Sequence, residues 1–177
     1  MDPSNSNLEL LNVKVTDIIR IGSPENDKTV KLCTTVVEQL IEELKPILKY
    51  VCTPRDLYDG KSEGRIIGGE VSPKKITIHC ILIGDSSKVK SLGERVYLEN
   101  DGKFFEVLDT YPDNREVIYH PSPSKYAAWM NVPFSVLLEA LHGALKTARR
   151  KREEFLKSIK KREELLESIL TTIREHK

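Results

Sequence analysis

The chain has 177 residues, and its 28 lysines and arginines nearly balance its 27 aspartates and glutamates, giving a net charge of +1 at pH 7. Hydrophobic residues make up 39% of the sequence, enough for one ordinary core. No apolar run approaches the ~18 residues that a membrane-spanning helix requires. Residues 1–7 lack the basic start and apolar run of a signal peptide. The composition therefore predicts a soluble protein that does not act in a membrane.

The three cysteines, Cys33, Cys52 and Cys80, are odd in number and lie in periodic apolar segments. This pattern is typical of free thiols in a reducing compartment, which predicts a cytoplasmic protein. The sequence contains no closely spaced pair of cysteines or histidines of the kind that holds zinc, so we expect no metal and no cofactor.

The carboxylates of Asp109, Asp113 and Glu116 cluster around a predicted turn, and they are interpreted as a solvated turn rather than a catalytic pair. No catalytic residue is predicted.

The N-terminal segment gives two conflicting signals. Ser6 and Glu9 have the spacing of a helical capping box, whereas the β-branched residues between Val13 and Ile21 favour a strand. We prefer a strand over about residues 12–21, at the edge of a sheet.

A helix is expected next, over about residues 24–51. Ser23 can cap it, Pro24 suits its first position, and its apolar residues recur at intervals of three and four. Pro46 should bend its last turns.

Strands are predicted between about residues 65 and 120. From Lys74 the apolar period becomes two, and both faces of the segment as far as Ile83 are largely apolar, as in a strand covered on both sides. The Asp101-Gly102 step suits a tight hairpin turn. The expected strands lie near residues 66–67, 75–83, 94–99, 103–110 and 116–120. Together they predict an α+β fold, an antiparallel β-meander sheet of about four to five strands packed by the N-terminal helix.

The chain is expected to divide into an α+β domain, residues 1–130, and a long C-terminal helix, residues 131–177. A helical turn over residues 126–130 should close one end of the core. Asn131 is the expected cap of the long helix, with Pro133 in its first turn.

Apolar residues of the long helix follow a heptad, coiled-coil-like pattern. About 45 residues at 1.5 Å each give a rod of about 65 Å, whereas a body of ~130 residues has a diameter of about 36 Å. The helix should therefore overhang by about 25–30 Å and expose apolar residues to association. The predicted interaction seam comprises Leu145, Phe155, Leu156, Ile159, Leu165, Leu166, Ile169, Leu170 and Ile173.

The partner of this seam is left open by the pattern. A parallel homodimer is disfavoured because Arg152 and Arg162 would face their own copies. An antiparallel pair, a larger bundle or docking onto the sheet of another subunit fits better. The alternative is a helix that lies along its own domain and needs no partner.

The charge is distributed unevenly. Residues 146–162 contain nine basic and two acidic residues, whereas residues 1–145 hold a net negative charge. A strip of this kind can follow a phosphate backbone, although interrupting acids such as Glu153 and Glu154 are typical of a solvated helix face. The predicted polyanion strip comprises Lys146, Arg149, Arg150, Lys157, Lys160 and Lys161.

The leading hypothesis is a non-enzymatic interaction or adaptor protein that self-associates or docks a partner through its C-terminal helix. The second hypothesis is a nucleic-acid-associated protein that uses the basic strip. The third is an enzyme whose active site is assembled from scattered residues.

Overall fold

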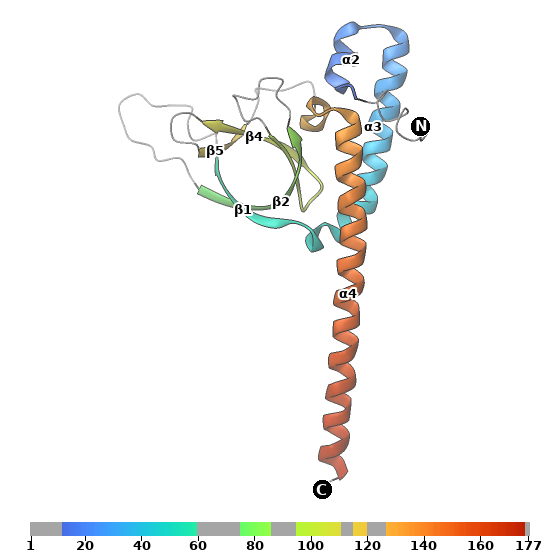
Figure 1. Ribbon diagram of the computed structural model, residues 1–177, viewed down its shortest axis with the longest axis vertical. Helices are drawn as coiled ribbons and strands as arrows, with labels where there is room; N and C mark the ends of the chain where they lie inside the picture. The colour runs from blue at the N-terminus through green and yellow to red at the C-terminus, as the bar shows by residue number, and fades with distance from the viewer. Residues whose placement is uncertain (1–11, 60–74, 86–94, 111–114, 120–126, 176–177) are drawn as a thin grey trace, which may run out of the picture.

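The computed structural model describes residues 12–59, 75–85, 95–110, 115–119 and 127–175. A five-stranded barrel lies beside two long helices, and one of these helices extends far past the body (Figure 1). The elements are, in chain order, α2 (Val15–Ile21), α3 (Pro24–Leu44), η1 (Lys45–Tyr50), β1 (Thr53–Asp59), β2 (Lys75–Asp85), β3 (Arg95–Glu99), β4 (Phe104–Thr110), β5 (Arg115–Tyr119), η4 (Ala128–Asn131) and α4 (Phe134–Glu175). The α+β class is thereby confirmed.

The sheet is a closed barrel with the strand order β1-β2-β3-β4-β5. Sequential neighbours are antiparallel, as predicted, but β1 and β5 also pair in parallel, with Tyr58 opposite Val117. The open meander sheet was therefore wrong. Closure depends on β1, which was not among the predicted strands because residues 55–73 are rich in Gly, Asp, Lys and Ser, a composition typical of a loop. Among the described strands, closure leaves no unpaired edge.

The hairpin between β3 and β4 is confirmed. Gly102 has φ 91°, a conformation that favours glycine, and the backbone N–H of Lys103 donates to the carboxylate of Asp101 over 2.9 Å.

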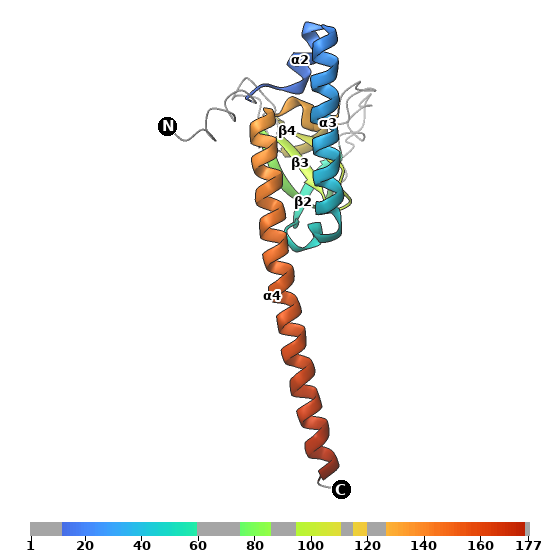
Figure 2. The ribbon, with the colours of Figure 1, turned by 90° about the vertical axis from the view of Figure 1, so that its right-hand side faces the viewer.

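The barrel wall separates two apolar clusters. Inside it, Leu57, Cys80, Tyr97, Val107 and Ile118 are buried against one another. Outside it, the larger cluster joins β2 and β3 to α3, α4 and the turn η4, which was predicted correctly. Figure 2 shows α3 and α4 side by side over this outer face. Strand β3 is buried on both faces. In β2 only Cys80 and Ile83 are buried, whereas His79 and Leu82 are exposed, so β2 is not the strand covered on both sides that the sequence predicts.

The predicted strand over residues 12–21 was wrong, because Val15–Ile21 form the helix α2. Val15 is fully buried and Ile19, one turn later, packs beside it, so β-branched side chains fill a helical face here. The helix ends at Gly22, which has φ 64°. Tertiary packing overrides the strand propensity of this segment.

Helix α3 begins as predicted, since the Ser23 side chain accepts a hydrogen bond from the backbone N–H of Asn26. At Pro46, where a bend was expected, the α-helix gives way to the 3₁₀ turns of η1.

Helix α4 begins at Phe134, three residues later than predicted. Asn131 is instead part of η4, and its side-chain amide donates to Glu106 over 2.7 Å. Close packing follows at Gly84 of β2, where an added Cβ would lie 3.0 Å from Val132 and 3.2 Å from Val136. The absence of a side chain at Gly84 thus lets the start of α4 approach the barrel.

The predicted overhang is confirmed. Helix α4 has 42 residues, which correspond to about 63 Å. Its first part is buried at Leu137, Leu141, Leu145 and Ala148. Beyond Ala148 nearly every described residue is exposed, and the helix projects from the body (Figures 1 and 2). Neither α3 nor α4, the two described helices of sufficient length, is apolar enough to span a lipid bilayer.

Candidate functional site

The projecting part of α4 exposes a continuous apolar stripe. Seven large apolar residues there are between 46% and 62% exposed. Ile159, half-buried, lies on the same side of the helix. We call the following residues the distal stripe: Phe155, Leu156, Ile159, Leu165, Leu166, Ile169, Leu170 and Ile173.

Leu145 does not belong to this stripe. It was predicted as part of the interaction seam, but it is only 8% exposed and packs in the core of its own chain. The heptad pattern of the sequence therefore covers two different surfaces, one inside the body and one on the overhang. The same spacing marks both, which is why the sequence did not separate them.

Phe155, the first residue of the stripe, contacts the body. Its ring centroid lies 6.0 Å from that of Tyr50 in η1. Further along the helix, Lys160 forms an ion pair with Glu164 and the hydroxyl of Thr171 donates to the carbonyl of Glu167, so both contacts lie within α4 itself. Exposed pairs one turn apart contribute about 0.3–0.5 kcal/mol each. Amphipathic helices gain most of their stability from packing, and seven large apolar side chains of the stripe are about half exposed in the described part of the chain.

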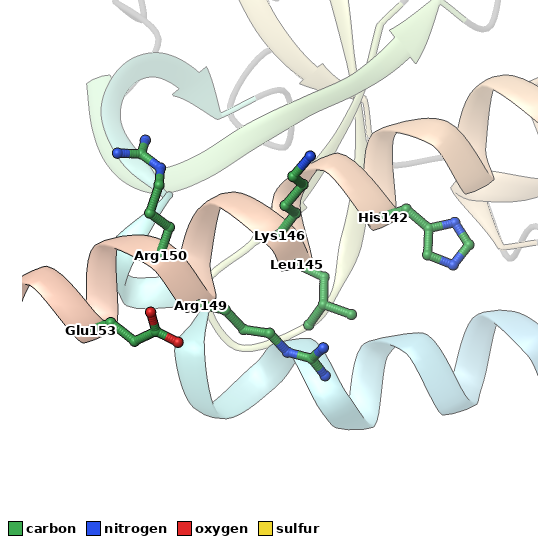
Figure 3. A pocket seen from close by; sticks show the side chains of 6 residues that line it. All are labelled: His142, Leu145, Lys146, Arg149, Arg150 and Glu153. Carbon is green, nitrogen blue, oxygen red and sulfur yellow. The ribbon is translucent and has the colours of Figure 1, made fainter.

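The basic strip is split by the fold. Lys146, Arg149 and Arg150 line a shallow hollow of about 430 Å³ together with His142, Leu145 and Glu153. Figure 3 shows Arg149 directed towards α3, whereas Lys146 and Arg150 point to the other side of α4. The remaining strip residues, Lys157, Lys160 and Lys161, follow on the overhang.

Acidic side chains neutralise part of this charge. Arg149 pairs with Glu43 of α3 and Arg150 with Glu154, each over 2.8 Å. All four side chains are more than half exposed, so these pairs are weak and open to competition. The hollow is thus a modestly basic surface rather than a preformed anion pocket.

A partly exposed polar cluster in the barrel was not predicted from the sequence. Arg55 of β1 donates through Nε to Glu116 of β5 over 2.8 Å and through a second nitrogen to the other carboxylate oxygen. Arg95 of β3 reaches the same carboxylate over 2.9 Å. The Arg55 guanidinium also lies 5.0 Å from the ring centroid of Tyr97.

This cluster ties three strands together through one carboxylate. Its hydrogen bonds to Glu116 raise the pKa of the Arg55 guanidinium, which keeps that group charged. Glu116 is therefore a structural partner and not the solvated turn acid that its neighbours suggested. Arg55 precedes the buried Leu57 by two residues, so in a strand both side chains point to the inside of the barrel. This spacing predicts the cluster only once β1 is known to be a strand.

The cysteines do not form a reactive or metal-binding centre in the described part of the chain. Burial raises the pKa of the Cys52 and Cys80 thiols to about 11, so both stay protonated near neutral pH. Among the described residues no three metal-ligating side chains come together. His79 is exposed while Cys80 is buried, because adjacent strand residues point to opposite faces.

Comparison with known proteins gives no relative: no protein-family model, curated protein or solved structure matches the chain.

Proposed function

We propose that this chain is a non-enzymatic interaction protein that self-associates, or docks a partner, through the distal stripe of α4. The proposal rests on the exposure of apolar side chains along one side of the part of α4 that projects beyond the body. The three free thiols fit the reducing environment of the cytoplasm.

The magnitude supports association. Full burial of a large aliphatic or aromatic side chain is worth about 1.5–3 kcal/mol. The stripe residues are roughly half exposed, so covering each would contribute about 1 kcal/mol. Eight such residues provide a gross gain of several kcal/mol per chain, which is of the size needed to offset the ~4–15 kcal/mol cost of bringing two molecules together.

The test compares charges placed on and off the stripe. Leu166→Glu with Ile169→Glu puts two carboxylates into the stripe, and Ser168→Glu with Thr171→Glu puts the same two charges on the outer side of the same turns. Light scattering should show that the first pair abolishes association and that the second leaves it intact. Association that survives the first pair, or is lost equally in both, would refute the proposal.

A second function, binding of a polyanion such as nucleic acid, is favoured by the hollow beside Lys146, Arg149 and Arg150. A chain that uses these cations releases counterions, so its affinity for duplex DNA should fall steeply with salt. Glutamine at these three positions should remove the binding and leave the mass in solution unchanged. No retention on DNA at low salt would exclude this function.

A further inference from the structure

We propose that the partner of the distal stripe is a second copy of this chain, lying antiparallel, with the two-fold axis close to Glu163. The inference rests on the proposed function and adds the identity and the orientation of the partner. Three independent features of the overhang lead to it: the symmetry of its apolar residues, the division of its charge and its length.

The apolar residues are arranged symmetrically along the overhang. Phe155, Leu156 and Ile159 form one group, and Ile169, Leu170 and Ile173 form another, with Leu165 and Leu166 between them. Turning a second copy around an axis near Glu163 brings each group opposite the other. The pairs Phe155–Ile173, Ile159–Ile169 and Leu156–Leu170 then lie within about one helical turn of the same level. Both groups are covered at once.

The charge of the overhang is divided between its halves. Arg149–Arg162 contains eight basic and two acidic residues, a net charge of +6, whereas Glu163–Glu175 contains one basic and four acidic residues, a net charge of −3. A parallel pair would set the +6 segment beside its own copy. An antiparallel pair sets it beside the −3 segment, and like charges facing each other across an interface are costly. Charge therefore selects the antiparallel orientation.

The length of the overhang fits the same axis. The described helix emerges from the core after Ala148 and ends at Glu175, so the middle of the exposed segment lies near Arg162. With the axis next to that midpoint, the end of one helix reaches the level at which the other helix leaves its body. The two helices overlap along most of the exposed length, and the end of one helix lies near the level of Phe155, where the other helix contacts its own body through Tyr50.

The arrangement has a functional consequence. The two bodies sit at opposite ends of a helical pair whose shared length is about 40 Å. Each body then presents the same surfaces in opposite directions. Such a two-headed dimer is suited to bridge two identical binding partners.

Orientation can be measured by cross-linking with two single-cysteine additions, Ser158→Cys and Thr172→Cys. Both positions carry small polar residues beside the stripe, so the apolar contacts are preserved. In the antiparallel pair, residue 158 of one chain lies within about one turn of residue 172 of the other, and each is at least about 15 Å from its own copy. In a parallel pair each lies beside its own copy, and the two positions are about 21 Å apart.

The experiment mixes the two full-length variants, one with a size tag, and adds a short bis-maleimide. The inference predicts abundant mixed covalent dimer and little from either variant alone. The unmodified chain is the control for the natural thiols, of which Cys33 and Cys80 are buried and Cys52 is half-buried.

Other outcomes contradict the inference in distinguishable ways. Self-cross-linking of each variant, without mixed dimer, indicates a parallel pair; it overturns the orientation and leaves the proposed function standing. Association in solution without any cross-link overturns the position of the axis. A mass of one chain at every concentration overturns the second copy as partner and, with it, self-association.

Discussion

The two parts of helix α4 should respond differently to the same substitution. Leu141 is fully buried in the core of the body, whereas Leu166 lies on the overhang and is 60% exposed. Leu→Ala removes the same atoms at both positions, and alanine has the highest helix propensity, so the helix itself is not weakened. The comparison isolates the packing environment.

At Leu141 the substitution leaves a cavity between α4 and the outer face of the barrel. Leu→Ala in a core costs about 2–5 kcal/mol. With a urea dependence of about 2 kcal/mol per molar for a chain of this size, the unfolding midpoint should fall by about 1–2.5 M. At Leu166 the free energy of unfolding of the dilute chain should change by less than about 0.5 kcal/mol. Association should weaken by about 1–2 kcal/mol per pair, because each of the two chains loses part of a contact worth about 1 kcal/mol.

Urea unfolding followed by circular dichroism measures the first effect, and sedimentation at several concentrations measures the second. Equal loss of stability at the two positions would mean that the overhang packs on its own body. A negligible loss at Leu141 would mean that the core between α4 and the barrel is wrongly assigned.

Three further predictions concern the body. Gly84→Ala should lower the free energy of unfolding by about 1–3 kcal/mol, because the added Cβ would lie 3.0 and 3.2 Å from two valines. Gly143→Ala, with nothing within 4 Å, should raise it by about 0.5–1 kcal/mol. Thermal unfolding measures both, and an unchanged stability of Gly84→Ala would contradict the close approach. Glu116→Gln should lower the free energy of unfolding by about 1–2 kcal/mol, a value reduced to allow for the partial exposure of the ion pairs. Urea unfolding measures it, and an unchanged midpoint would show that the carboxylate is dispensable. Folding raises the pKa of the Cys52 and Cys80 thiols from about 9 to about 11, so their contribution to stability is complete below pH 9 and is lost as the pH rises towards 11. Urea midpoints from pH 8 to pH 11 test this. A variant with alanine at both positions whose stability declines as steeply as that of the natural chain would refute it.

Much of the local structure was predictable from the sequence. The capped helix at Ser23, the hairpin at Gly102 and the length of the C-terminal helix all follow from local chemistry. The overhang followed from comparing a helix length with a body diameter, which requires no knowledge of the fold.

What escaped prediction depends on contacts between distant residues. Helix α2 carries a strand-like composition, but the burial of Val15 and Ile19 against the core decides its conformation. Strand β1 looks like a loop until its pairing with β2 and β5 is known, and the cluster of Arg55 with Glu116 cannot be inferred before that strand. The heptad pattern, likewise, did not show where the body ends.

The central claim is that the distal stripe joins this chain to another copy of itself. Sedimentation equilibrium of the unmodified full-length protein, from about 1 µM to about 100 µM, tests it most directly. The account predicts a mass that rises to twice 20.2 kDa and no further. A mass that stays at 20.2 kDa over the whole range would contradict it.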